Sequence, residues 1–317
     1  MSISAYSGVS DTGHKRRRNE DSYVVAPPLF AVADGMGGAQ AGEIASKLAA
    51  AALEDTDSGG LSGEERVTAL IQEANRRVYE RSNEDPSASG MGTTITVALV
   101  EDGTVTIVHV GDSRAYRYRD GAIEQITEDH SLVNELMKTG KLSPEEAEMH
   151  PQRSVITRAL GTDPDVDIDS FTLKTQEGDV FLLCSDGLTT MVDDNDILGV
   201  LEKYHDDLDR VTKSLISAAN RGGGEDNITV IAFAIANGGE SARSNEDTME
   251  TVVAPPVDTM VVPPEEVDHV FVEPGSPEAE ALTRRDPISP AARVRLVLTM
   301  LGLLAIAAVL LVWGLVR

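Results

Sequence analysis

Five short segments of this sequence place acidic side chains in polar or glycine-rich turns beside apolar, strand-like runs. They cover residues 16–22, 33–38, 110–114, 184–188 and 224–229. A strand that ends in Asp directs a carboxylate from the rigid edge of a sheet, and several such ends that converge would form a site of oxygen ligands. Mg²⁺ and Mn²⁺ prefer carboxylates, carbonyls and water. A single Asp-Gly pair indicates an ordinary turn, so the predicted metal site rests on the set of five.

The order of these segments resembles the metal-dependent serine/threonine protein phosphatases of the 2C type, especially their bacterial members. The matching motifs are Gly13-x-x-Arg16-x-x-Asn19-Glu20-Asp21, Asp34-Gly35-Met36-Gly37-Gly38, Gly90-Met91-Gly92-Thr93-Thr94, Gly111-Asp112-Ser113-Arg114, Asp129-His130-Ser131, Arg158-Ala159-Leu160-Gly161, Ser185-Asp186-Gly187 and Glu225-Asp226-Asn227. They cover residues 4–236, three quarters of the chain. The resemblance implies an α+β fold: a four-layer α-β-β-α sandwich of two packed antiparallel sheets flanked by helices, with the metal cluster in a cleft at one end.

The resemblance also implies which residues hold the first metal ion. Asp34 matches the carboxylate that bridges two ions, and the carbonyl of Gly35 matches a ligand of one of them. Asp186 and Asp226 match the remaining ligands of the first ion.

Further matches concern the second ion, a looser third ion and the substrate. Asp21 and Glu20 match residues that hold the second ion, largely through water. Asp112, with Asp186, matches the third metal site of bacterial members. Arg16 matches the arginine that clamps the substrate phosphate, for which a guanidinium fork is well suited.

The activity implied by the resemblance is hydrolysis of phosphoserine and phosphothreonine in proteins by a water that bridges two Mg²⁺ or Mn²⁺ ions. Such a pair of cations lowers the pKa of the water and neutralises phosphoryl charge. The implied partners are phosphorylated proteins and a cognate bacterial serine/threonine protein kinase, which the enzyme counteracts. No covalent intermediate is needed, so we expect Cys184, in an apolar run, to be buried packing.

One position departs from part of the family. Some relatives carry a histidine, assigned as the general acid, where this chain has Met36. His109 and His130 are the nearest candidates by motif, but a structural role is favoured for each. The general acid is left unassigned, and Thr93 and Thr94 are interpreted as strand residues rather than ligands.

Two alternatives remain open at this point. The first is a phosphatase dedicated to one regulatory partner, of the anti-sigma-antagonist type, although such enzymes tend to lack the arginine found here at Arg16. The second is a pseudophosphatase that binds phosphoproteins without turnover. Degenerate members lose metal-ligand carboxylates, whereas Asp21, Asp34, Asp186 and Asp226 are all present.

Apolar, β-branched runs predict the strands that must position these side chains, over residues 23–26, 29–33, 94–100, 105–110, 115–118, 180–184 and 228–235. Helical patterns cover residues 41–55, 63–82, 131–139, 193–203 and 206–221. Asp102-Gly103 is a hairpin signal. Residues 132–157 correspond to the family's variable flap, which we expect to gate and select substrate.

Composition excludes several classes of protein. The chain has 317 residues, a formal net charge of −26 and one cysteine. That charge argues against nucleic-acid binding, which requires a basic face. A single cysteine rules out an internal disulfide framework and multi-cysteine metal sites.

The C-terminal quarter predicts a different organisation from the phosphatase-like domain over residues 1–237. Residues 238–290 contain eight of the 14 prolines, twelve acids and three arginines, which favours a disordered linker. Residues 291–317 predict a transmembrane tail anchor, because 296–316 is an uncharged run of 21 residues. The arginines that precede this run place the catalytic domain on the cytoplasmic face of a bacterial cell membrane.

Overall fold

A computed structural model describes residues 1–37, 41–54 and 60–236 of the chain. The predicted linker and tail anchor lie outside the described residues, as does Gly38 of the second motif. Within the described ranges, no helix is both long enough and apolar enough to cross a membrane.

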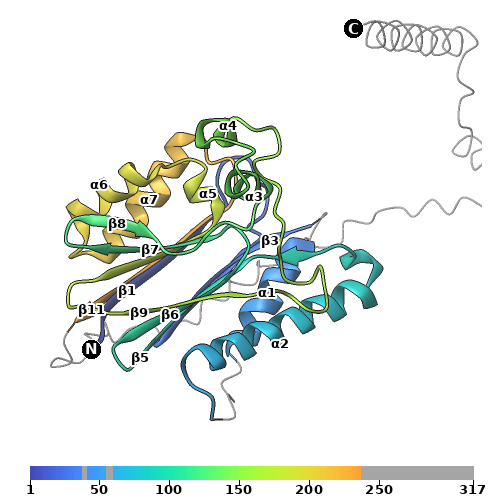
Figure 1. Ribbon diagram of the computed structural model, residues 1–317, viewed down its shortest axis with the longest axis horizontal. Helices are drawn as coiled ribbons and strands as arrows, with labels where there is room; N and C mark the ends of the chain where they lie inside the picture. Colours follow the sequence, from blue (N-terminus) through green and yellow to red (C-terminus); the bar gives the residue numbers. More distant parts are fainter. Residues whose placement is uncertain (38–40, 55–59, 237–317) are drawn as a thin grey trace, which may run out of the picture. The chain divides into compact units, whose positions relative to one another are not determined.

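Two antiparallel sheets form the centre of the domain (Figure 1). One sheet contains, in spatial order, β2 (Asp21–Ala26), β3 (Leu29–Met36), β5 (Ile95–Glu101), β6 (Thr104–Val110) and β9 (Asp169–Lys174), with the short β4 (Gly92–Thr93) paired to β3. The other contains β1 (Ser2–Asp11), β11 (Ile228–Ala236), β10 (Val180–Cys184), β7 (Arg114–Arg119) and β8 (Ala122–Gln125).

Long helices cover the outer faces of both sheets. Helices α1 (Ala41–Glu54) and α2 (Gly63–Glu84) pack on the β2–β9 sheet, while α6 (Asp194–Tyr204) and α7 (Leu208–Gly222) pack on the β1–β8 sheet (Figure 1). The alanine-rich α1 allows a close approach to the strands beneath it. The predicted four-layer α-β-β-α order is therefore confirmed.

Three apolar clusters fill the spaces between the four layers. One lies between α1, α2 and the first sheet, and a second lies between α6, α7 and the other sheet. The third lies between the sheets, where the ring of Phe233 stacks on those of Phe30 and Phe181 at 4.4 and 5.2 Å. This central layer fixes the two sheets against each other, and with them the strand ends that carry the acids.

Short elements lie at the strand ends. They are the 3₁₀ turn η1 (Pro86–Ala88) and the helices α3 (Leu132–Lys138), α4 (Pro144–Glu148) and α5 (Asp186–Thr189). Helices α3 and α4 belong to the segment predicted as the flap. Helix α4 has a full capping box, in which Ser143 and Glu146 bond reciprocally to backbone N–H groups.

The sequence patterns found the central elements and missed the peripheral ones. The predicted hairpin is confirmed: Asp102 and Gly103 both have positive φ, at 51° and 77°, between β5 and β6. Strands β1, β8 and β9 were not predicted because they lie near sheet edges and are half exposed, so their sequences are only weakly apolar. Helix α5 is a single turn, too short for a periodic pattern.

Candidate active site

Five aspartates come from the ends of strands in both sheets. Asp21 begins β2 and pairs across the ladder with Asp34, near the end of β3. Asp112 lies in the turn that leads from β6 in one sheet to β7 in the other. Asp186 is the first residue of α5, directly after β10, and Asp226 lies just before β11. The fold thus brings the five predicted aspartates to one end of the sandwich.

These carboxylates are buried together and repel one another. Loss of hydration, followed by the charges of Asp21, Asp186, Asp112 and Asp226, raises the pKa of Asp34 well above its ordinary value. Burial is also the main reason why the pKa of Asp21 rises to about 7 and that of Asp112 to about 8. The site holds more negative charge than its own cations offset.

Three carboxylate oxygens test whether this site suits a metal ion. Asp21 Oδ1, Asp112 Oδ1 and Asp186 Oδ1 are buried and have no hydrogen-bond partner. A buried oxygen without a partner is unfavourable by about 1–3 kcal/mol, and a hard cation would satisfy it. Within the described ranges, no three acidic, histidine or cysteine side chains are yet arranged to hold one ion. The donor chemistry of these carboxylates fits Mg²⁺ or Mn²⁺.

Arg16 pairs with an acid of the set. Its Nη2 donates to Asp226 Oδ2 at 2.7 Å, and its Nη1 lies 4.0 Å from Glu20 Oε2. The Arg16 side chain is 49% exposed, whereas that of Glu20 is 15% exposed. Burial raises the pKa of Glu20 against the lowering effect of Arg16. The predicted phosphate clamp therefore lies beside the predicted ligands, with its fork engaged by Asp226.

Hydroxyl groups hold Asp21 in place. Ser185 Oγ and Thr229 Oγ1 donate to Asp21 Oδ2 at 2.8 and 2.6 Å. These bonds occupy one carboxylate oxygen and leave Oδ1 without a partner. The positioning role of Ser185 and Thr229 was not predicted; the only signal is that each lies within three residues of a motif acid.

Backbone contacts fix Asp34. Its N–H donates to Thr94 Oγ1 at 3.0 Å, and its carbonyl accepts from Thr93 Oγ1 and from the N–H of Thr94, both at 2.9 Å. The two threonines thus contact Asp34 through its backbone, as expected of strand residues. At Gly35, an added Cβ would lie 2.1 Å from the carbonyl oxygen of Gly42, so α1 requires glycine there.

Asn227 ties the Arg16 loop to the Asp226 loop. Its Oδ1 accepts from the backbone N–H of Glu20 at 2.8 Å. Its Nδ2 donates to the carbonyl oxygens of Thr12 and Arg18, each at 2.9 Å. One amide side chain therefore joins two segments of the site that are about two hundred residues apart in sequence.

The two candidate histidines are structural. His109 is fully buried, its Nδ1 bonds Thr96 Oγ1 at 2.9 Å, and burial lowers its pKa to about 4. His130 accepts the N–H of Gly111 on Nδ1 at 3.0 Å, and its Nε2 lies 3.1 Å from Asp169 Oδ2. His130 thereby supports the turn that carries Asp112. The Nε2 of His109 has no hydrogen-bond partner, but it is buried and a substrate does not reach it.

Cys184 is fully buried in β10, as expected. Burial raises the pKa of its thiol to about 12, so it stays protonated at neutral pH.

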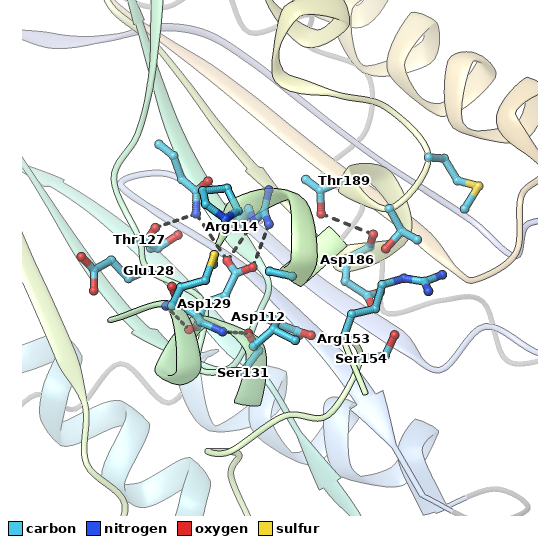
Figure 2. A pocket seen from close by; sticks show the side chains of 18 of the residues that line it. Asp112, Arg114, Thr127, Glu128, Asp129, Ser131, Arg153, Ser154, Asp186 and Thr189 are labelled. Carbon is cyan, nitrogen blue, oxygen red and sulfur yellow. Dashed lines mark hydrogen bonds and ion pairs between the residues drawn. The ribbon is translucent and has the colours of Figure 1, made fainter. Parts of the chain in front are cut away.

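A cavity of about 990 Å³ opens beside the acids (Figure 2). Asp112 and Asp186 line it together with Arg153 and Ser154 of the predicted flap. Arg114, which also lines the cavity, makes a bidentate contact with Asp129, to which its Nε and Nη2 donate at 2.9 and 2.7 Å. The flap segment thus forms a wall of the space that a substrate would enter.

Residues 14–220 match the model of a protein family described as protein phosphatase 2C. The serine/threonine phosphatase stp of Listeria monocytogenes serotype 4b (strain F2365) is 41% identical over 233 residues, covering 70% of this chain and 92% of stp. The serine/threonine protein phosphatase PstP of Mycobacterium tuberculosis (strain H37Rv) is 42% identical over 231 residues. That alignment covers 71% of this chain and 44% of PstP.

Among solved structures, the catalytic domain of the serine/threonine protein phosphatase PstP in complex with two manganese ions is similar. The TM-score is 0.68 at 38% sequence identity, and the match covers 74% of this chain and 99% of that domain. The matched share of the chain agrees with the extent of the four-layer domain.

Proposed function

Because the chain belongs to the protein phosphatase 2C family and is a metal-dependent serine/threonine protein phosphatase, we propose that its cluster of strand-end carboxylates is the active site of that enzyme. The observation that carries the proposal is that Asp34 comes to the same end of the sandwich as four other aspartates, where burial and then the charges of those carboxylates raise its pKa. Such mutual repulsion is expected where divalent cations bind.

Asp34, Asp186 and Asp226 would hold the first metal ion, and the carbonyl of Gly35 would bind one of the two ions that Asp34 serves. Supporting this assignment, Asp186 keeps a buried oxygen without a partner. Asp34 and Asp186 also remain partly accessible. Bound there, the ions supply Lewis acidity that lowers the pKa of water and offsets phosphoryl charge.

Asp34, Asp21 and Glu20 would hold the second ion, Asp21 and Glu20 largely through water. The free Oδ1 of Asp21 and the mostly buried carboxylate of Glu20 support this assignment. Asp112, with Asp186, holds a looser third ion at the cavity, where Asp112 Oδ1 also has no partner.

Arg16 binds the substrate phosphate. One nitrogen of its fork, Nη2, now donates to Asp226, and a phosphate dianion offers a bidentate partner with more charge. Arg16 therefore exchanges Asp226 for phosphate, which frees an Asp226 oxygen for a cation.

The substrates are phosphoserine and phosphothreonine proteins, and the enzyme counteracts a cognate bacterial serine/threonine kinase. The cavity beside Asp112 and Asp186 has a volume of about 990 Å³, and flap residues such as Arg153 and Ser154 line its wall. The flap is therefore the part of the chain that selects among phosphoproteins.

Residues 291–317 anchor the domain to the cytoplasmic face of the cell membrane, and residues 238–290 form the linker. The uncharged run 296–316 supports this assignment, because about 20 apolar residues span the hydrocarbon core.

The test is hydrolysis of p-nitrophenyl phosphate and of a phosphothreonine peptide by the full chain with Mn²⁺, with and without chelator. We expect turnover of both substrates that disappears with chelator and returns with added Mn²⁺. Metal-independent turnover, or none in any condition, would contradict the proposal.

A further inference from the structure

A second cavity, of about 540 Å³, lies between helices α6 and α7. Four cations line it: Lys203 from α6, and Arg210, Lys213 and Arg221 from α7. None of its lining residues belongs to the carboxylate site. We call it the basic groove.

The basic groove follows from the spacing of α7. Residues 210, 213, 217 and 221 recur at intervals of three and four, which places them on one helix face. The opposite face, including Val211, Leu215 and Ala219, is buried against the β1–β8 sheet. The cations therefore point outward and line a strip about 17 Å long, from the helical rise over eleven residues.

The cations of the basic groove lack acidic partners among the described residues. Lys203, Arg210, Lys213 and Arg221 form no ion pair with a carboxylate there, although many other exposed cations of the domain do. Arg221 instead donates to Ser217 Oγ at 2.7 Å. In a chain with a net charge of −26, four clustered cations without carboxylate partners stand out as a binding surface for anions.

Tyr204 orders two of these cations. Lys203 Nζ and Arg210 Cζ lie 4.9 and 4.8 Å from the centre of its ring. Cation–π contacts of this kind hold long side chains in place without neutralising them. The charges of the basic groove are thus partly preorganised for an anionic ligand.

The chain itself supplies an acidic segment close by. Ser7, which pairs with Ala232 of β11, donates to Asp209 at the start of α7. Strand β11 therefore ends, at Ala236, near the end of the basic groove that carries Arg210. Four acids follow within fourteen residues, at Glu240, Glu246, Asp247 and Glu250, against one cation. Ten residues of chain reach at most about 35 Å, enough to bring Glu246 to either end of the groove.

We propose that the basic groove between α6 and α7 binds the acidic segment 240–250 of the same chain. Lys203, Arg210 and Lys213 face Glu246, Asp247 and Glu250, and the contact is ionic. Docking there fixes where the predicted linker leaves the domain. The proposal does not depend on the catalytic assignments, because it uses none of their residues.

Zero-length carbodiimide coupling of the full chain in neutral detergent, mapped by mass spectrometry, tests the proposal. The reagent joins a lysine to a carboxylate only where they are in contact. We expect Lys203 and Lys213 to couple to Glu246, Asp247 or Glu250 about tenfold more than Lys174 does. Lys174, an exposed lysine on β9, is the control, because the same chain segment joins the three acids to the domain whichever lysine they meet. The coupling should fall severalfold at about 0.5 M salt, because exposed charges are screened.

A charge swap provides the decisive variants. Lys213→Glu should lose its coupling to position 250, whereas the double variant Lys213→Glu/Glu250→Lys should recover it with reversed polarity. Turnover of p-nitrophenyl phosphate should match the wild type in both variants, which also checks that they fold.

Two results would overturn the proposal. The first is that Lys203 and Lys213 couple to the acidic segment no more than Lys174 does, or that their coupling is the same in the triple variant Glu246→Gln/Asp247→Asn/Glu250→Gln as in the wild type. The second combines two observations: neither lysine couples to the segment in neutral detergent, and both are protected from acetylation only when phosphatidylglycerol vesicles are present. That result would assign the basic groove to an anionic membrane surface.

Discussion

Asp21 is held in the site by two hydroxyl residues whose role the sequence motifs did not reveal. Two hydroxyls, from Ser185 and Thr229, satisfy its Oδ2 and leave Oδ1 available. Thr229 N–H in turn donates to Ser185 Oγ at 2.9 Å, so the two hydroxyl residues are fixed together. Supporting contacts of this type commonly change metal affinity 10–100-fold when they are lost.

At the residue scale, Asp34→Asn should abolish turnover while the fold is retained. The substitution removes the negative charge that would serve both proposed core ions. It also removes one of five carboxylates that repel one another. We expect turnover to fall by about a thousandfold or more, as for loss of a central electrostatic group. Calorimetry should show weakened Mn²⁺ binding, and the melting temperature without metal should be equal to or above that of the wild type. Wild-type turnover, or unchanged Mn²⁺ binding, would refute the role of Asp34.

His109 predicts a pH dependence of stability that does not involve the metal site. Burial, followed by the charge of His130, lowers its pKa from 6.5 to about 4. Between these values the unfolded chain binds a proton that the folded chain does not, so the free energy of unfolding falls as pH falls from about 6.5 to about 4. The fall from this residue is up to about 3 kcal/mol.

Urea unfolding from pH 4 to 7 measures this effect. His109→Gln should flatten the slope in that window. Equal slopes in the variant and the wild type would contradict the assignment.

At the element scale, the turn between β6 and β7 joins the two sheets and carries Asp112. Gly111 has φ of +118°, and an added Cβ would lie 2.5 Å from the Thr94 side chain. Thr94 in turn bonds Ser113 and the backbone of Asp34. The turn that carries Asp112 is therefore linked through Thr94 to the backbone of Asp34.

Gly111→Ala should destabilise the domain by about 3 kcal/mol or more, because left-handed strain and overpacking add. The matched control is Gly121→Ala in the β7–β8 turn, which also has positive φ, at +76°, but has nothing within 4 Å of an added Cβ. The control should lose only about 1 kcal/mol, the intrinsic penalty of that backbone region. Urea unfolding compares the two, and equal losses would show that Thr94 does not restrict the turn.

At the scale of the whole molecule, the domain and its proposed tether have separate tasks. The carboxylate site uses residues between Arg16 and Asp226, all within the four-layer domain. The stp relative is 92% covered by the same domain, so a phosphatase of this family needs little beyond it.

Deleting residues 291–317 should release the protein from membranes without changing turnover of p-nitrophenyl phosphate, because the small ester needs only the domain. Fractionation of cells into membrane pellet and supernatant measures the first effect. A truncated protein that still pellets with membranes would contradict the anchor, whereas altered turnover would show that the anchor acts on the site.

The sequence by itself determined the features that depend on neighbouring residues. Alternating and β-branched runs predicted the central strands, the Asp102-Gly103 turn chemistry predicted its hairpin, and apolar periodicity predicted α1, α2, α6 and α7. The ordered motifs indicated the family and the eight candidate site residues.

Only the tertiary structure decided which atoms of those residues are engaged. Arg16 and Asp226 are 210 positions apart and form an ion pair, and Ser185 bonds Asp21 across 164 positions. The basic groove exists only because α6 packs beside α7. Local conformation is set by adjacent side chains, but hydrogen bonding and desolvation depend on how the two sheets pack, which no local pattern encodes.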